Sequence, residues 1–105
     1  MIAVITHHWA KEDKFEQAKA LLNRNGFAQS GARGFIYRAT MLSKTDAKQI
    51  TSIVLWTSDE IYDLWKASPE RERVMAGADM FWTKKPESER FNLVNMTDIT
   101  KSNID

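Results

Sequence analysis

The stretch IVLWTSDEIYDLWKASPE, residues 53–70, decides the fold because it contains the end of a strand followed by two helix starts. Residues 50–56 are apolar and β-branched over a length typical of a strand. Thr57 and Glu60 have the spacing of a capping box, in which two side chains satisfy the unpaired backbone donors of a helix start. A helix is therefore predicted here, with an inward stripe of Ile61, Leu64, Trp65 and Ser68.

The second helix start lies at Ser68, a capping residue followed by proline at the first helical position. We predict a short helix to about Met75, closed by Gly77, since glycine tolerates a positive φ. Residues 80–82 form an apolar patch in an irregular segment, and residues 91–97 (FNLVNMT) are the predicted last strand.

Upstream of this stretch, residues 2–9 (IAVITHHW) are apolar and β-branched, which predicts a first strand. Residues 12–24 have apolar side chains at helical spacing, and Asn25 with Gly26 is predicted to end that helix. A loop at residues 29–34 then leads to a second strand at residues 35–42. Six polar residues separate this strand from the next, which favours an antiparallel hairpin.

The predicted order is β-α-β-β-α-β in a single domain over residues 1–105, with a frayed tail from about Lys101. This split βαβ pattern is typical of an α+β, ferredoxin-like fold, a four-stranded antiparallel sheet with its helices on one face. The strands at residues 35–42 and 50–56 carry large apolar side chains towards both faces. A sheet with one face in water should alternate, so we expect a homodimer in which two sheets pack into a dimeric α+β barrel.

Charge and cysteine content narrow the function classes. The 15 basic and 14 acidic residues leave a formal charge of +1, so no overall field favours nucleic acid or anionic lipid. The absence of cysteine excludes disulfides, thiolate nucleophiles and sulfur-ligated metals. The N-terminus lacks the pattern of a signal peptide or a membrane span. We therefore predict a cytoplasmic protein that binds neither nucleic acid nor membrane.

Residues 53–70 resemble the signature of the antibiotic-biosynthesis-monooxygenase family, and a looser similarity extends over about residues 1–97. The signature is a strand ending in an aromatic residue, here Trp56, an acidic helix with a second tryptophan, here Trp65, and then serine, proline and glutamate at residues 68–70. The resemblance implies a dimeric α+β barrel and a monooxygenase. The family includes cofactor-free oxygenases of aromatic polyketides and quinols as well as heme-degrading enzymes.

The heme-degrading branch combines the motif tryptophan with an asparagine on the first strand and a histidine about three helical turns later. In this sequence the tryptophan is Trp65, but the first strand has Thr6, His7 and His8 instead of asparagine, and Met75 occupies the histidine position. The heme triad is therefore not carried over. Met75 is a possible weak axial ligand, although a methionine on a helix is more often core filler.

His7 and His8 are the only histidines, and adjacent residues of a strand point to opposite faces, so at most one enters a given cavity. That histidine, with a near-neutral pKa, is suited to take the proton of a phenol or quinol, beside Trp65 as the third candidate catalytic residue. The alternative for either histidine is a structural role at a strand end or at the rim of the dimer. Arg38, if it points inwards, is suited to hold a substrate anion; otherwise it pairs with an acidic neighbour.

An aromatic pocket for a flat substrate is the second predicted feature of the site. Its candidate walls, which core packing also explains, are Trp65, Trp56, Trp82, Trp9, Tyr37, Phe35 and Phe81. The sequence has no glycine-rich phosphate loop, paired-carboxylate motif or metal-ligand spacing, so we expect no cofactor and no metal.

These features predict a cofactor-independent monooxygenase that acts on a small aromatic or quinol-like substrate. Three alternatives remain: a non-catalytic dimer that binds a small aromatic ligand, a heme-binding or heme-degrading protein without the usual triad, and a purely structural dimer whose barrel is filled.

Overall fold

The computed structural model describes residues 1–97. The predicted tail from Lys101 lies outside the described residues. The elements are β1 (Ile2–Trp9), η1 (Glu12–Lys14), α1 (Phe15–Ser30), β2 (Phe35–Leu42), β3 (Gln49–Trp56), α2 (Asp59–Lys66), α3 (Pro69–Val74), η2 (Ala78–Phe81) and β4 (Glu87–Asn92). None of the helices within this range is long and apolar enough to cross a membrane.

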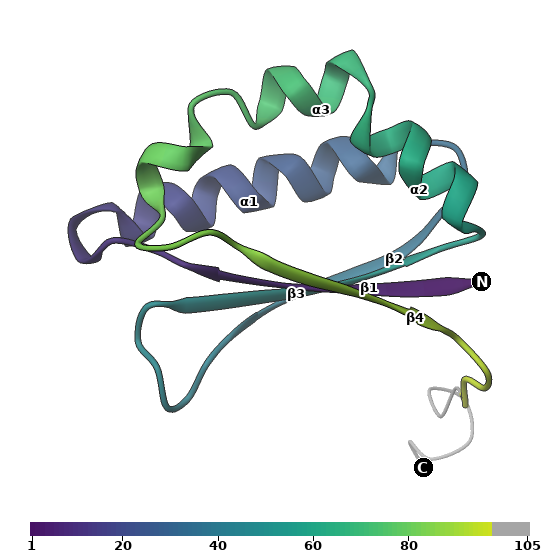
Figure 1. The fold of residues 1–105 in the computed structure, drawn as a ribbon, viewed down its shortest axis with the longest axis horizontal. Coiled ribbons are helices and arrows are strands. Elements are labelled where there is room, and N and C mark those ends of the chain that lie inside the picture. Colours follow the sequence, from purple (N-terminus) through teal and green to yellow (C-terminus); the bar gives the residue numbers. More distant parts are fainter. Residues whose placement is uncertain (98–105) are drawn as a thin grey trace, which may run out of the picture.

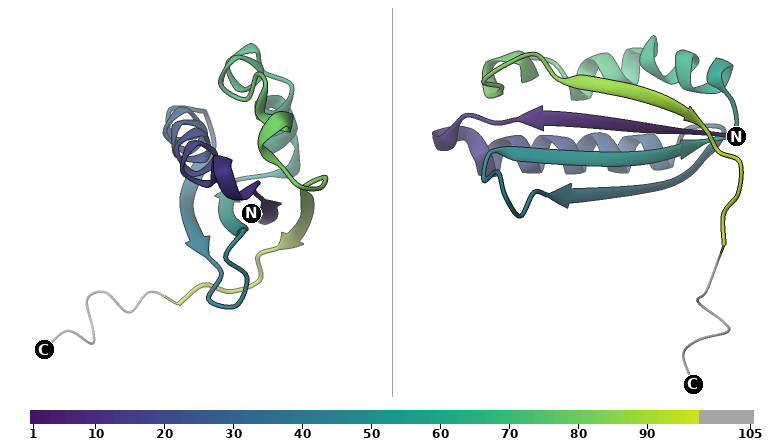
Figure 2. Two further views of the ribbon diagram at one scale, coloured as in Figure 1. Left: turned by 90° about the vertical axis from the view of Figure 1, so that its left-hand side faces the viewer. Right: turned by 60° about the horizontal axis from the view of Figure 1, so that its bottom comes forward.

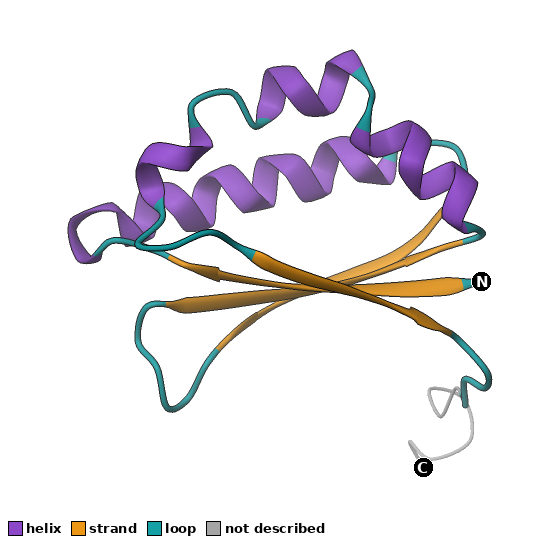
Figure 3. Ribbon diagram, in the orientation of Figure 1, coloured by secondary structure: helices purple, strands orange, loops and turns teal. Residues whose placement is uncertain are grey.

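The four strands form one antiparallel sheet in the order β2-β3-β1-β4, with β1 and β3 in the middle. All three α-helices lie on the same side of this sheet (Figures 1 and 3), and no helix or strand of residues 1–97 covers the opposite side (Figure 2, right). The predicted α+β, ferredoxin-like arrangement with helices on one face is therefore confirmed. The helices cover this face because β1 and β3 direct buried apolar side chains towards it. Ile2 is paired there with Trp56, and Val4 with Val54.

Trp56 is the centre of the core at one end of the sheet. Its side chain is fully buried, and its ring lies 6.3 Å from the ring of Trp65 at an interplanar angle of 27°. The rings of Phe35 and Tyr62 each lie 5.7 Å from it. Burial of aromatic side chains of this size is the main stabilising contribution of such a cluster. A second cluster, at the other end, joins α1 to η2 through Leu22, Ile50 and Trp82.

The uncovered face of the sheet is also apolar, as predicted from the strands. Residues that alternate with the helix-facing set point to this side. They include Ala3, Ile5, Tyr37, Ala39, Ile53, Leu55 and Phe91, which are brought side by side by the strand register. Tyr37 is 52% exposed and Phe91 is 42% exposed, so this face presents large apolar groups to solvent in the single chain.

The prediction that α1 ends at Asn25 and Gly26 is wrong, because the helix continues to Ser30. Asn25 and Gly26 are both buried inside the helix. A Cβ atom at Gly26 would lie 2.6 Å from the Nε atom of Arg38, so glycine is needed here for close approach of a side chain rather than for a turn. Sequence alone does not distinguish these two uses of glycine.

The predicted last strand at residues 91–97 is also misplaced, since β4 is Glu87–Asn92. All six residues of β4 are exposed, and all of them except Phe91 are polar. Hydrophobic patterns report burial, so an exposed edge strand held mainly by its backbone pairing with β1 produces no such pattern.

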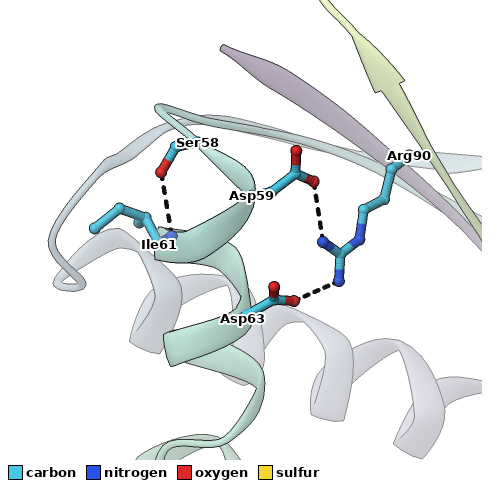
Figure 4. Close-up of polar contacts among 5 residues, drawn as sticks. All are labelled: Ser58, Asp59, Ile61, Asp63 and Arg90. Carbon is cyan, nitrogen blue, oxygen red and sulfur yellow. Dashed lines mark hydrogen bonds and ion pairs between the residues drawn. The ribbon is translucent and has the colours of Figure 1, made fainter.

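The start of α2 differs in detail from the predicted capping box. Ser58, not Thr57, is the N-cap, and its Oγ accepts a hydrogen bond from the Ile61 backbone N–H at 3.2 Å (Figure 4). Trp65 is buried as predicted, whereas Leu64 is 66% exposed and does not belong to the inward stripe. The predicted start of α3 is confirmed, because the Ser68 Oγ accepts from the Arg71 N–H at 3.1 Å.

We expect Ser58→Ala to lower the free energy of unfolding by about 1 kcal/mol, because it removes the acceptor for a helix-start N–H group. Thr57→Ala is the matched control and should have a much smaller effect. Urea denaturation of the two variants checks this. Equal losses, or a larger loss for Thr57→Ala, would restore the predicted capping box.

Candidate functional site

A cavity of about 490 Å³ lies between the helices and the sheet. Val4, Thr6 and His8 of β1 and Ser52 and Val54 of β3 contribute to its lining, as do residues of α1, α2 and α3 and of the segment that joins η2 to β4. A volume of this size suits a small organic molecule. Its presence argues against the purely structural alternative, which predicted a filled interior.

Buried polar side chains line this cavity. Within residues 1–97, the buried polar side chains are those of His8, Asn25, Gln29 and Ser52, and all four line this one cavity. Burying a polar group costs free energy unless a hydrogen bond compensates, so a fold gains little stability by gathering such groups. His8 Nδ1 and Asn25 Oδ1 are buried without a hydrogen-bond partner among the described residues. The arrangement is that of a site prepared for a polar ligand.

His8 is the histidine that enters the cavity. Its ring centroid is 4.5 Å from that of Trp82. Burial, followed by the positive charges of Arg38, Arg71 and His7, lowers the pKa of His8 from 6.5 to about 4. The near-neutral pKa expected from the sequence is therefore corrected: at neutral pH this imidazole is uncharged and able to accept a proton or a hydrogen bond.

His7 points to the opposite side of the sheet, as the alternation of β1 requires. Its Nδ1 lies 2.7 Å from Thr51 Oγ1 and 3.0 Å from Gln49 Nε2, both on β3. These contacts place His7 in a polar cluster on the uncovered face, away from the cavity. The structure thus separates the two candidate histidines.

Arg38 points inwards from β2 and lines the cavity beneath α1. Its Nη1 donates to Gln29 Oε1 at 2.7 Å, and its Nη2 donates to the Leu22 carbonyl oxygen at 3.5 Å. Both partners are neutral, and no carboxylate in residues 1–97 lies within ion-pair distance of this guanidinium. The acidic neighbour considered as an alternative from the sequence is thus absent from that range. Burial lowers the pKa of Arg38 from its ordinary value.

Only part of the predicted aromatic wall faces the cavity. Trp65 and Trp82 line it, together with Tyr62, which the sequence analysis missed. Trp56 lies in the core behind Trp65, and Phe81 packs edge-on against Trp82. Tyr37 is on the uncovered face, where the structure also places Trp9, while Phe35 packs against Trp56.

Among the lining residues that sequence reasoning did not single out are Asn25, Gln29, Ser52 and Tyr62. Asn25 and Gln29 are four positions apart, one turn of a helix, and next to the apolar stripe formed by Leu21 and Leu22. Two polar residues at that spacing were a usable signal for a polar site. The prediction that the helix ended before Asn25 concealed it.

Arg90 of β4 forms ion pairs with α2, the helix that contributes one wall of the cavity. Its Nη1 and Nη2 lie 3.0 Å from Asp59 Oδ1 and 2.6 Å from Asp63 Oδ1 (Figure 4). Its guanidinium carbon lies 4.7 Å from the centre of the Tyr62 ring. Hydrogen bonding to Arg90 lowers the pKa of Asp63, and burial raises the pKa of Tyr62. The contacts hold the edge strand to the helix that carries Tyr62 and Trp65.

No protein-family model matches the sequence, and no curated protein is significantly similar to it. Solved structures, in contrast, share its fold. An antibiotic biosynthesis monooxygenase aligns with a TM-score of 0.81 at 13% identity, covering 90% of this chain and all of the other. Rv0793 from Mycobacterium tuberculosis aligns at 0.83 and 15%, covering 92% and 98%. SnoaB, a cofactor-independent oxygenase from Streptomyces nogalater, aligns at 0.77 and 12%, covering 90% and 95%. The chain therefore has the fold of antibiotic biosynthesis monooxygenases.

In an NMR pH titration, we expect the His8 imidazole to remain neutral until the pH approaches about 4. An unfolded chain binds that proton near pH 6.5, so the native state takes up fewer protons between these two values. The free energy of unfolding therefore decreases as the pH falls from about 6.5 towards 4, by up to about 1.4 kcal/mol per pH unit. Above about pH 6.5 the histidine is neutral in both states and causes no such decrease.

The variant His8→Gln controls for the carboxylates that titrate in the same range. Its free energy of unfolding should depend less steeply on pH between 4 and 6.5 than that of the wild type. Identical slopes, or a wild-type His8 signal that titrates near 6.5, would show that the ring is not desolvated.

Proposed function

We propose that the protein is a cofactor-independent monooxygenase that oxidises a small aromatic or quinol-like substrate in the cavity beside Trp65. The observation that carries the proposal is His8: a buried, neutral imidazole with an unpartnered Nδ1, in a cavity walled by Trp65, Trp82 and Tyr62. The shared fold with a cofactor-independent oxygenase supports the reaction class.

His8 acts as the general base for the hydroxyl group of the substrate. The charges of Arg38 and Arg71 disfavour a second cation on His8. The same charges favour the substrate anion, so they stabilise the anionic partner of the ion pair that forms when the substrate gives its proton to His8. The protein thereby stabilises the electron-rich form of the substrate, which is the form that reacts with dioxygen.

The substrate itself supplies the electrons in this scheme. The deprotonated ring forms a carbon–oxygen bond with dioxygen at a carbon that bears two hydrogens in its keto form. The oxygen–oxygen bond then breaks with loss of water, so CH2 and O2 become C=O and H2O. The aromatic walls orient the flat ring, and removal of bulk water protects the anion from reprotonation.

We expect His8→Ala to lower kcat/KM for oxygen uptake by a factor of about 10² to 10⁴ across a panel of quinols and phenols, because the proton acceptor is lost. Trp65→Phe should lower it by less than about tenfold, because phenylalanine preserves part of the aromatic wall. His7→Ala is the matched control and should retain wild-type activity, since its side chain points to the other face.

Other outcomes assign the cavity differently. Tight binding of an aromatic ligand without consumption of oxygen would make the protein a binding module. A Soret band on titration with hemin would favour a heme protein, for which Met75 and His8 both line the cavity. Equal loss of activity in His7→Ala and His8→Ala would contradict the role of His8.

We also propose that two chains associate through the uncovered sheet faces as a homodimer. Support comes from the row of apolar residues that crosses all four strands on this side, which is unfavourable in water. Packing two such faces together encloses the residues in a barrel between two sheets.

Sedimentation equilibrium at micromolar concentration should therefore give twice the mass of one chain. Tyr37→Asp, on the uncovered face, should shift the protein towards the monomer because it buries a charge in the interface. Leu64→Asp, on the helical side, changes an even more exposed apolar residue and should leave the dimer intact. A wild-type monomer would contradict the proposal.

A further inference from the structure

The cavity has an excess of positive charge that the chain as a whole does not have. Its lining contains Arg38, Lys66, Arg71 and Lys85 but only one carboxylate, Asp79. The full sequence, in contrast, contains 15 basic and 14 acidic residues. Asp79 offsets one of these four cations, and His8, which is uncharged at neutral pH, adds no charge of either sign. The imbalance is local and belongs to the cavity.

We infer that the ligand of this cavity is an aromatic acid, whose fixed carboxylate binds Arg38 while its ring lies against Trp65 and Trp82. This inference deepens the proposed function and rests on the same site. It separates two tasks: Arg38 holds a group that is already ionised in solution, and His8 is left to exchange a proton with a second group of the ligand.

Arg38 is preorganised for this role. The missing side chain of Gly26 leaves room for its Nε and Cδ atoms against α1, and Gln29 fixes Nη1 from the same helix. A guanidinium fixed in one plane matches the two oxygens of a carboxylate. A partly buried cation whose only partners are neutral loses hydration without gaining an ion pair, so an anionic ligand would supply what the described residues do not.

The remaining cations surround the more exposed part of the lining. Lys66 and Lys85 are exposed and Arg71 is partly exposed, and the Lys66 ammonium lies 5.6 Å from the centre of the Tyr62 ring. Exposed charges of one sign at a concave site raise the local concentration of an oppositely charged ligand. The cations are therefore placed to attract the acid, and Arg38 is placed to bind it.

Isothermal titration calorimetry with 1-naphthoate and its neutral analogue 1-naphthamide tests the inference. We expect wild-type protein to bind the carboxylate at least about tenfold more tightly, since a charge-assisted bidentate contact is present for only one of the two. Arg38→Met should abolish this preference, and Arg38→Lys should restore part of it. Arg73→Gln changes an exposed arginine that does not line the cavity and should leave the preference unchanged.

Equal affinity for the two compounds in the wild type, absence of binding to both, or a preference that survives Arg38→Met would each overturn the inference. If near-UV circular dichroism shows that Arg38→Met does not fold, Lys66→Gln combined with Lys85→Gln provides a second test on exposed positions. That pair should weaken 1-naphthoate about two- to tenfold and leave 1-naphthamide unchanged. An equal effect on both compounds would contradict the account.

The outcome is independent of the oxygenase proposal. Selective binding of 1-naphthoate to a protein that consumes no oxygen with any quinol retires the enzymatic function and supports the ligand class. Oxygen uptake with neutral quinols, combined with no preference for the carboxylate, supports the enzyme and retires the aromatic acid.

Discussion

The seating of the Arg38 guanidinium beneath α1 is the contact on which the rest of the site depends. It brings a charge from β2 against a helix that would otherwise be expected to lie on apolar side chains. The helix accommodates it with a glycine at position 26 and an amide acceptor at Gln29. A side chain at position 26 and a guanidinium below it cannot occupy the same space, so glycine at this position is a condition for the positive charge of the cavity.

The cavity shows a conflict between stability and function. The aromatic cluster around Trp56 and the apolar contacts of Leu22 and Ile50 stabilise the two ends of the domain. Between them lie His8 Nδ1 and Asn25 Oδ1, two buried polar atoms with no hydrogen-bond partner among the described residues, which lower stability. Such a loss of stability is expected where a ligand completes the hydrogen bonding. It is a large effect for a small domain with a modest core.

The elements that could be predicted are those whose apolar or capping residues recur at the spacing of a strand or a helix. The strands at β1, β2 and β3 and the Ser68–Pro69 helix start could be predicted because apolar spacing and capping chemistry are local. β4 could not be predicted, since its side chains are exposed and mostly polar and therefore show no apolar spacing. The candidate site was half predictable: alternation required that one histidine point inwards, but which one depends on how β1 is registered against β3 and the helices. The role of Asn25 was hidden because a glycine followed it.

The central claim is that the polar side chains around the cavity are present for a ligand and not for the fold. The free energy of unfolding of a His8→Leu, Asn25→Leu double variant, measured by urea denaturation at pH 7, tests it most directly. The account predicts a stability equal to the wild type or higher by about 1 to 2 kcal/mol, because unpartnered buried polar atoms are replaced by apolar ones of similar or larger volume. A loss of more than about 2 kcal/mol would show that these side chains hold the structure together, and would contradict the account.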